Sequence, residues 1–426
     1  MSTQKHIWEG LGISLLSVCV MGCGQQSFLF LTRPGSGSTG SKEESEAYYA
    51  AMDIPPERTL KEWMQNRCFD EEDIAAYYYN ETDLGLGREM HCAKCSDKSQ
   101  RPKLISCAVS NHGIPQGLDR VQFGRGREES ITKALTDLEN FVRAPGKQRG
   151  ATVAMDFDPK RSGDDKVQFY IYDARDPTLL APDSQGQETL IPGLQLDSEG
   201  GEFNRGVKYM RNCLACHGGR YDTATNRILG ATFLDFDATL YIFANDSANT
   251  HAPKISVPGA RFTTRSATND EAIRRMNHLV REVADEVHAT ELVARIDGSY
   301  SKPVQDPTSV YVPGYVPKAW SGPEPFRVFD GKTVTNRDFY DVVVHRYCAM
   351  CHFSQTAGNN VRQIDPSQPL TFGSADQWLR NRNLIDGSDS REVIRKDVCG
   401  SSEMPHAEVT RLNLLRDSRA LGYICN

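Results

Sequence analysis

Two short segments with the pattern C-x-x-C-H carry the clearest chemistry in this chain of 426 residues. Two thiols at this spacing lie on one side of a turn, where each can add to a vinyl group of one porphyrin, and the adjacent imidazole then lies beneath the iron. The sequence therefore predicts two covalently bound haem c groups with histidine as the proximal ligand. The residues are Cys213, Cys216 and His217 in the first segment, and Cys348, Cys351 and His352 in the second.

The two segments differ in what could fill the sixth iron position. Met404 precedes a proline about 50 residues after His352, in a stretch that resembles the distal-ligand loop of class I cytochromes c. No such loop follows His217. Met276 lies on the apolar stripe of a predicted helix at 271–287, where we expect a core residue. The first haem is therefore predicted to have an open sixth position or a ligand from elsewhere in the chain.

The start of the chain indicates export. Lys5 precedes an apolar run from Leu11 to Gly22 that is too short to span a bilayer, and Cys23 follows. This arrangement resembles a bacterial lipoprotein signal, which implies that residues 1–22 are removed together with Cys19 and that Cys23 is lipidated. Gly24 favours the outer membrane by the sorting rule of such lipoproteins. Residues 23–43 then form a flexible tether in an oxidising compartment.

Of the twelve cysteines, six remain once the haem and leader cysteines are set aside. We expect Cys399 and Cys425 to pair, which requires the closing helix over 406–424 to bend or break near Asp417 or Gly422, because a straight helix would hold the two ends too far apart. The other four could form two disulfides of unknown pairing or a Cys₄ zinc site, and the compartment favours disulfides. They are Cys68, Cys92, Cys95 and Cys107.

Hydrophobic periodicity outlines the elements that position these segments. Helical spacing predicts helices at 59–66, 128–142 and 339–347. Residues 151–157 and 167–172 are predicted to be strands joined by a turn as a hairpin. The predicted order is an α+β domain at 44–200, a first haem segment at 201–297, a proline-rich linker at 298–325 and a class I-like cytochrome c domain at 326–426. The fold class is thus expected to be mainly α, with an α+β N-terminal domain and two cytochrome c-like helical haem segments.

Composition excludes several classes of protein. With 39% hydrophobic and 25% charged residues, the chain is neither disordered, nor collagen-like, nor a multi-span membrane protein. A net charge of −7 argues against nucleic-acid binding and suits a basic redox partner.

Four phrases spread over most of the chain resemble a group of uncharacterised exported bacterial proteins with two c-haem motifs. They are Asp83–His91, Ala151–Met155, Cys216–Gly219 and Met404–Ala407. The resemblance implies architecture and haem count but no reaction. It draws attention to His91 and then Met90 as distal ligands for the first haem, with Met155 as the next candidate.

The function expected from these observations is relay of single electrons by a dihaem cytochrome, exported to the periplasm and lipid-anchored at the outer membrane. An enzyme resembling dihaem peroxidases, with the first haem as an open catalytic site, is the first alternative, although no catalytic acid or base can be named. A haem-based sensor or interaction module is the second. An electron carrier is favoured over an enzyme because no flavin, quinoprotein or nucleophile motif occurs.

Overall fold

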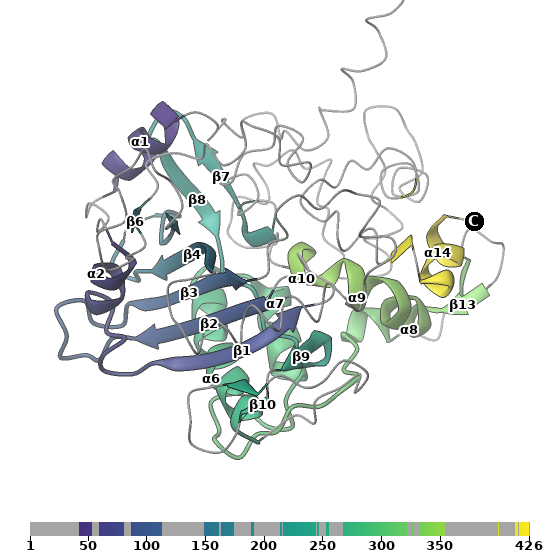
Figure 1. Ribbon diagram of the computed structural model, residues 1–426. Coiled ribbons are helices and arrows are strands. Elements are labelled where there is room, and N and C mark those ends of the chain that lie inside the picture. Colours follow the sequence, from purple (N-terminus) through teal and green to yellow (C-terminus); the bar gives the residue numbers. More distant parts are fainter. Residues whose placement is uncertain are drawn as a thin grey trace, which may run out of the picture.

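The computed structural model describes the greater part of the chain between residues 42 and 425 (Figure 1). The described residues are 42–52, 59–80, 87–112, 149–161, 163–173, 189–190, 214, 216–243, 245–246, 253–254, 267–321, 325–327, 333–353, 399, 414–415 and 417–425. The signal peptide, the tether as far as residue 41, the predicted helix at 128–142 and Met404 lie outside them.

An antiparallel sheet of seven strands, in the order β6-β5-β4-β3-β2-β1-β9, forms the centre of the protein. Aromatic and β-branched residues make up most of β1 and β5, as suits a pleated and well-covered surface. The strands are β1 (Ile74–Asn80), β2 (Gly87–Lys94), β3 (Ile105–His112), β4 (Arg149–Phe157), β5 (Val167–Asp173), β6 (Thr189–Leu190) and β9 (Tyr241–Phe243). The hairpin predicted at 151–172 is confirmed as β4 and β5, which pair from Thr152 opposite Tyr172 to Phe157 opposite Val167.

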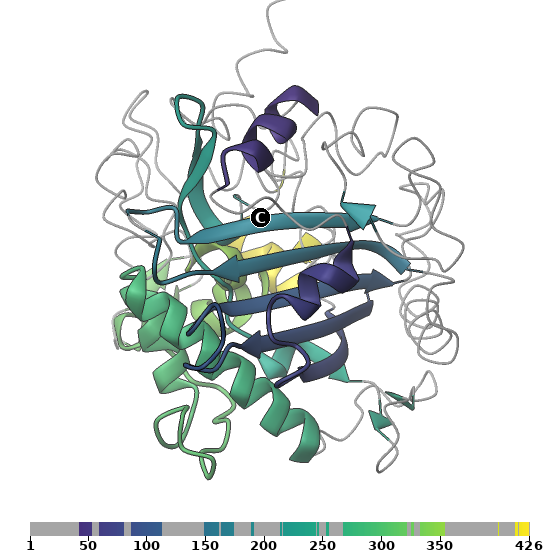
Figure 2. The same cartoon turned by 90° about the vertical axis from the view of Figure 1, so that its left-hand side faces the viewer.

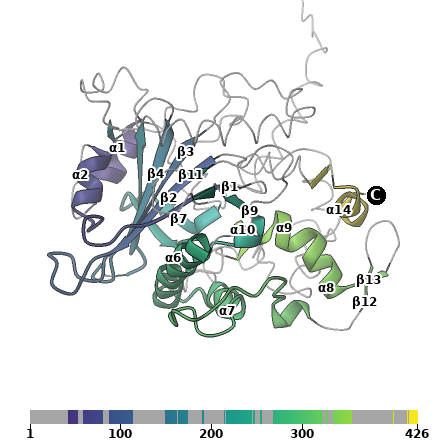
Figure 3. The ribbon, with the colours of Figure 1, turned by 60° about the horizontal axis from the view of Figure 1, so that its bottom comes forward.

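Helices α1 (Lys42–Ala50) and α2 (Leu60–Gln65) lie on one side of the sheet (Figures 2 and 3). Thr59 and Glu62 form a capping box at the start of α2, which satisfies two backbone N–H groups and fixes where the predicted helix at 59–66 begins. Trp63 is fully buried and packs against the rings of Tyr170 and Tyr172 on β5. The apolar side of α2 therefore covers this face of the sheet.

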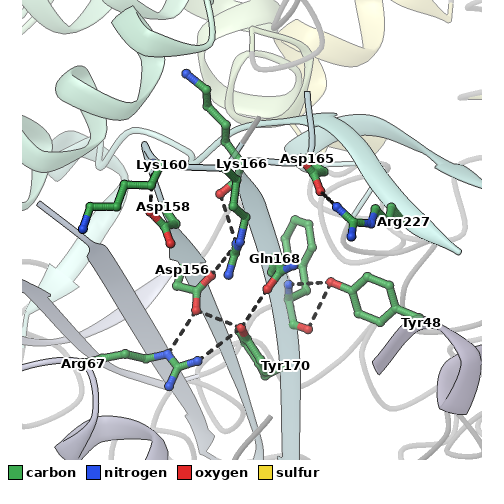
Figure 4. A network of polar contacts seen from close by, with 12 residues as sticks. Tyr48, Arg67, Asp156, Asp158, Lys160, Asp165, Lys166, Gln168, Tyr170 and Arg227 are labelled. Atoms are coloured by element: carbon green, nitrogen blue, oxygen red, sulfur yellow. Dashed lines mark hydrogen bonds and ion pairs between the residues drawn. The ribbon is translucent and has the colours of Figure 1, made fainter. Parts of the chain in front are cut away.

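A buried polar network anchors α2 to the same face (Figure 4). Asp156 on β4 accepts hydrogen bonds from Arg67 at 3.1 Å, from Arg161 at 3.1 Å and from the Tyr170 hydroxyl at 2.8 Å. The guanidinium of Arg67 also lies over the rings of Trp63 and Tyr170. Because Asp156 is completely buried, removal of either arginine would leave a charge with fewer partners in a desolvated site.

Helices α6 (Ala267–Glu286) and α7 (Thr290–Gly298) cover the opposite side of the sheet (Figure 3). Lys94 on β2 reaches across to Glu282 on α6, with 2.5 Å between Nζ and Oε2. Met276 is fully buried on the apolar stripe of α6, as expected for a core residue. Gly298 closes α7 beneath the ring of Tyr315, where a Cβ atom would collide with that ring.

The second C-x-x-C-H segment lies in a smaller cluster of elements to one side (Figure 1). A hairpin of β12 (Pro325–Arg327) and β13 (Thr333–Thr335) leads into α8 (Asn336–Phe339), the π-helical turn η5 (Tyr340–Val344), α9 (His345–Tyr347) and α10 (Ala349–His352). This confirms a helical stretch at 339–347. Its buried residues form a second hydrophobic core with Trp320 and with α14 (Ser418–Ile424).

The described part of the chain is α+β, and the prediction of a mainly α protein is wrong. Strands β1, β2 and β3 were not predicted. The first C-x-x-C-H segment is not a helical domain either, because the helical turn at His217 runs directly into the hairpin of β7 (Gly218–Asp222) and β8 (Arg227–Ala231). Short strands β10 (Asn245–Asp246) and β11 (Pro253–Lys254) form a further pair. Among the described residues, no helix is both long and apolar enough to cross a membrane.

Candidate functional site

His217 is held in a defined orientation by the hairpin that follows it. Its Nδ1 lies 2.9 Å from the backbone oxygen of Thr232, and the Thr232 N–H in turn donates to the His217 carbonyl at 2.9 Å. Since a carbonyl oxygen can only accept, Nδ1 must carry the proton, which leaves Nε2 as the basic atom of the neutral ring. The ring of Phe169 packs edge-on against the imidazole, with 5.4 Å between centroids.

Two glycines make this close return of the chain possible. Gly218 and Gly219 both have positive φ, at 71° and 79°. A Cβ atom on Gly219 would also lie 2.6 Å from the Leu229 carbonyl oxygen. Glycine is therefore required for the close approach of β7 to β8 directly after His217, where Gly218 pairs with Ala231, and this approach brings the Thr232 carbonyl to the imidazole.

Strand register decides which distal-ligand candidates share a face with His217. Residues paired directly across an antiparallel ladder point to the same face. Met155 pairs with Phe169, so it lies on the face that carries His217. Met90 belongs to the same face, because it is two residues from Cys92, which pairs through Cys107 with Met155.

His91 points to the other face of the sheet. Its backbone pairs through Ala108 and Ala154 with Tyr170, the residue in the Asp156 network. Both ring nitrogens are engaged, Nδ1 with Asp73 at 2.8 Å and Nε2 with Glu89 at 3.0 Å. Burial lowers the pKa of His91, but the hydrogen bonds that its ring donates to Asp73 and Glu89 outweigh this effect and raise the pKa to about 9. The structure therefore does not bring His91 and His217 together.

The second segment begins at a helix end within the smaller core. The Cys348 N–H donates to the Val344 carbonyl at 3.0 Å, and Ala349 is fully buried. Loss of water around the sulfur raises the pKa of Cys348 to about 12, although the residue as a whole is only half-buried. At neutral pH the group is a thiol, which is a poor nucleophile. The side chains of Cys351 and His352, like Cys213 and Met404, lie outside the described residues.

The six remaining cysteines form three disulfides. Cys92 and Cys107 bridge facing residues of β2 and β3, and a second bond joins the other two cysteines of this region. The open alternative of a Cys₄ zinc site is thereby excluded. The expected pair between residues 399 and 425 also forms a disulfide. As that pairing required, the closing helix is interrupted, because Asp417 is extended and caps α14 through the N–H groups of Arg419 and Ala420. The three bonds are Cys68–Cys95, Cys92–Cys107 and Cys399–Cys425.

The described residues contradict the prediction of two covalently bound haem c groups. Within them, no group of three or more His, Cys, Asp or Glu side chains is placed to hold a metal ion. Cysteines in this part of the chain are instead bonded to one another, as Cys68–Cys95 and Cys92–Cys107 show. Among these residues, the predicted iron ligand His217 is therefore not part of a metal-binding cluster.

A buried polar cluster that sequence reasoning missed lies around Asp237 and contacts the helix of the second segment. Asp237, which follows β8, accepts from His345 Nε2 at 2.5 Å, from Arg295 at 3.1 Å and from the Tyr311 hydroxyl at 2.7 Å. Arg295 also pairs with Asp235 at 2.8 Å. Burial raises the pKa of Asp237, but the hydrogen bond and charge of His345, together with Arg295, hold it well below its usual range.

One feature of the sequence could have revealed this cluster. Arg295 lies at helical spacing with Leu292 and Ile296, so it interrupts the apolar side of α7 with a charge. All three residues are buried. A buried arginine needs carboxylate partners, and the nearby pair Asp235 and Asp237 supplies them.

Comparisons with protein-family models, with curated proteins and with solved structures found no match.

Proposed function

We propose that the protein is an exported electron-transfer protein that relays single electrons through redox centres at its two C-x-x-C-H segments. Its place would be the periplasm, with a lipid on Cys23 as the anchor to the outer membrane. A net charge of −7 suits a basic redox protein as partner. The three disulfides support the assignment to an oxidising compartment, since such bonds persist there and are rare in the cytosol.

The observation that carries the proposal is the orientation of His217. A backbone carbonyl fixes the tautomer and the ring plane, and two positive-φ glycines bring that carbonyl into place. A histidine fixed in this way keeps Nε2 as its basic atom, and a hydrogen bond at the other ring nitrogen is the usual support of a ligating imidazole. The half-buried Cys216 lies next to it in the same helical turn. These contacts support a first redox centre beside the main core.

Potentiometric titration of the exported, full-length protein tests the proposal. We expect two one-electron steps with separate spectral signatures, and intact mass together with absorption spectra identifies the group at each segment. Two double variants, Cys213→Ser with Cys216→Ser and Cys348→Ser with Cys351→Ser, should each remove one step.

The matched control replaces the disulfide Cys68–Cys95 by serines, because it changes two cysteines of the same chain outside both segments. Both redox steps should persist in this control. A wild-type protein without a one-electron step, or double variants that keep both steps, would contradict the proposed function.

A further inference from the structure

The polar cluster around Asp237 lies on a continuous path of bonds between the two C-x-x-C-H segments. At one end, His217 is hydrogen-bonded to the Thr232 carbonyl at 2.9 Å. Five residue steps along the chain, which reach at most roughly 17 Å, lead from Thr232 to Asp237. At the other end, Asp237 accepts from His345 at 2.5 Å, three residues before Cys348.

Elements from four parts of the chain meet at this cluster. Asp235 and Asp237 come from the segment after β8, and Arg295 comes from α7. Tyr311 comes from the proline-rich stretch, and His345 opens α9. The guanidinium of Arg295 also lies 5.2 Å from the ring of Phe353, which follows the second C-x-x-C-H segment directly. The ring of Tyr340 stacks on His345 from the preceding turn.

Burial of charged groups where two cores meet costs desolvation free energy. Both aspartates and Arg295 are buried, and within the described residues Asp235 Oδ1 and Arg295 Nη1 have no hydrogen-bond partner. Replacement of buried ion pairs by apolar residues is often neutral or stabilising, so adhesion alone does not require them. Charged hydrogen bonds are directional, however, and they specify one arrangement of the groups that they join.

We propose that Asp237 is a positioning residue that couples the two C-x-x-C-H segments, because it holds His345 and the helix of the second segment against the segment 232–237, which begins at the residue that orients His217. This inference rests on the proposed function. With the contact in place, the two redox centres keep one fixed geometry and exchange electrons. Without it, the second segment is released from the segment 232–237, and internal exchange slows.

The rate of electron exchange between the two centres tests this coupling. The full-length protein is reduced rapidly with less than one electron per molecule, and redistribution between the centres is followed optically. Asp237→Asn and His345→Ala should slow redistribution roughly tenfold or more, the effect of losing a hydrogen bond to a charged group. His345→Gln should remain within about threefold of the wild-type rate, because its side-chain amide places a donor where Nε2 lies.

A second buried Asp–Arg pair provides the matched control. Asp165 is buried and pairs with Arg227 at the start of β8, outside the Asp237 cluster. Asp165→Asn should leave the exchange rate unchanged. A wild-type rate in His345→Ala, or equal slowing in Asp165→Asn and His345→Ala, overturns the inference while the proposed function stands. Absence of any redox step in the wild type overturns both.

Discussion

The imidazole of His217 takes its orientation from a backbone carbonyl, whereas that of His91 takes it from two carboxylates. A carbonyl oxygen fixes the tautomer of the imidazole, but it does not require the ring to be charged. Two carboxylates favour the protonated ring, and they do so in a site where the His91 side chain is only 16% exposed. The two histidines lie on opposite faces of one sheet, and their hydrogen-bond partners favour different protonation states. His91 has the contacts of a structural cation.

The raised pKa of His91 predicts a pH dependence of stability. A pKa of about 9 in the folded state, against 6.5 as the ordinary value, means that the stabilisation is complete below pH 6.5 and is lost as the pH rises through 9. After allowance for partial screening of Asp73, we expect a loss on the order of 2 kcal/mol in unfolding free energy. Urea unfolding below pH 6.5 and above pH 9 measures it.

His91→Gln should flatten that pH dependence. His278→Gln serves as the control, because His278 on α6 is more exposed and pairs with Glu282 in a single contact. Equal pH profiles for the wild type and His91→Gln would show that the loss arises elsewhere.

The elements show how far sequence patterns predict this fold. The stripe on α6 and the hairpin of β4 and β5 follow regular periods, and both were predicted. Strands β1, β2 and β3 were not, because helices cover both faces of the sheet and the strands lack the alternation of a half-exposed strand. In β1, for example, polar and apolar residues do not alternate from Ala75 to Tyr79.

Contacts between elements far apart in the sequence could not be predicted either. The Asp237 cluster joins residues more than 50 positions apart, for which a single sequence gives no pairing rule. The disulfide between residues 399 and 425 was predicted because both cysteines lie in the last predicted domain, and chain geometry added the condition that the closing helix must break. Its structural condition, the interruption at Asp417, is met by a side chain that also accepts from the Tyr347 hydroxyl at 3.0 Å.

Met276 on α6 allows a direct test of a core residue against a redox ligand. Because the side chain is fully buried on the apolar stripe, Met276→Leu conserves volume and should lower the unfolding free energy by less than about 1.5 kcal/mol. Met276→Ala leaves a cavity and should lower it by about 2–5 kcal/mol. Denaturant unfolding measures both effects. Neither variant should change the redox titration, and a shifted potential in Met276→Leu would identify Met276 as a ligand instead.

At the scale of the whole molecule, most buried apolar residues fall into two cores. The larger one joins the sheet, α2, α6 and α7, and the smaller one joins Trp320, the helix of the second C-x-x-C-H segment and α14. The two candidate redox segments of the protein thus belong to different cores. The contact of Asp237 and Arg295 with His345 and Phe353 is polar, so it specifies geometry more than it adds stability.

Two cores of unequal size predict two unfolding transitions, and the disulfides allow each to be assigned. Cys399–Cys425 lies in the smaller core and Cys68–Cys95 beside the larger one, with sequence separations of 26 and 27 residues. Loops of this length make the two bonds nearly equal in their effect on the unfolded chain, about 3.5 kcal/mol each. Differential scanning calorimetry of the two Cys→Ser double variants should therefore show shifts of similar size in different transitions. If either variant shifted both transitions together, the two cores would be one cooperative unit, and the polar contact at Asp237 would be strong enough to couple their unfolding as well as their geometry.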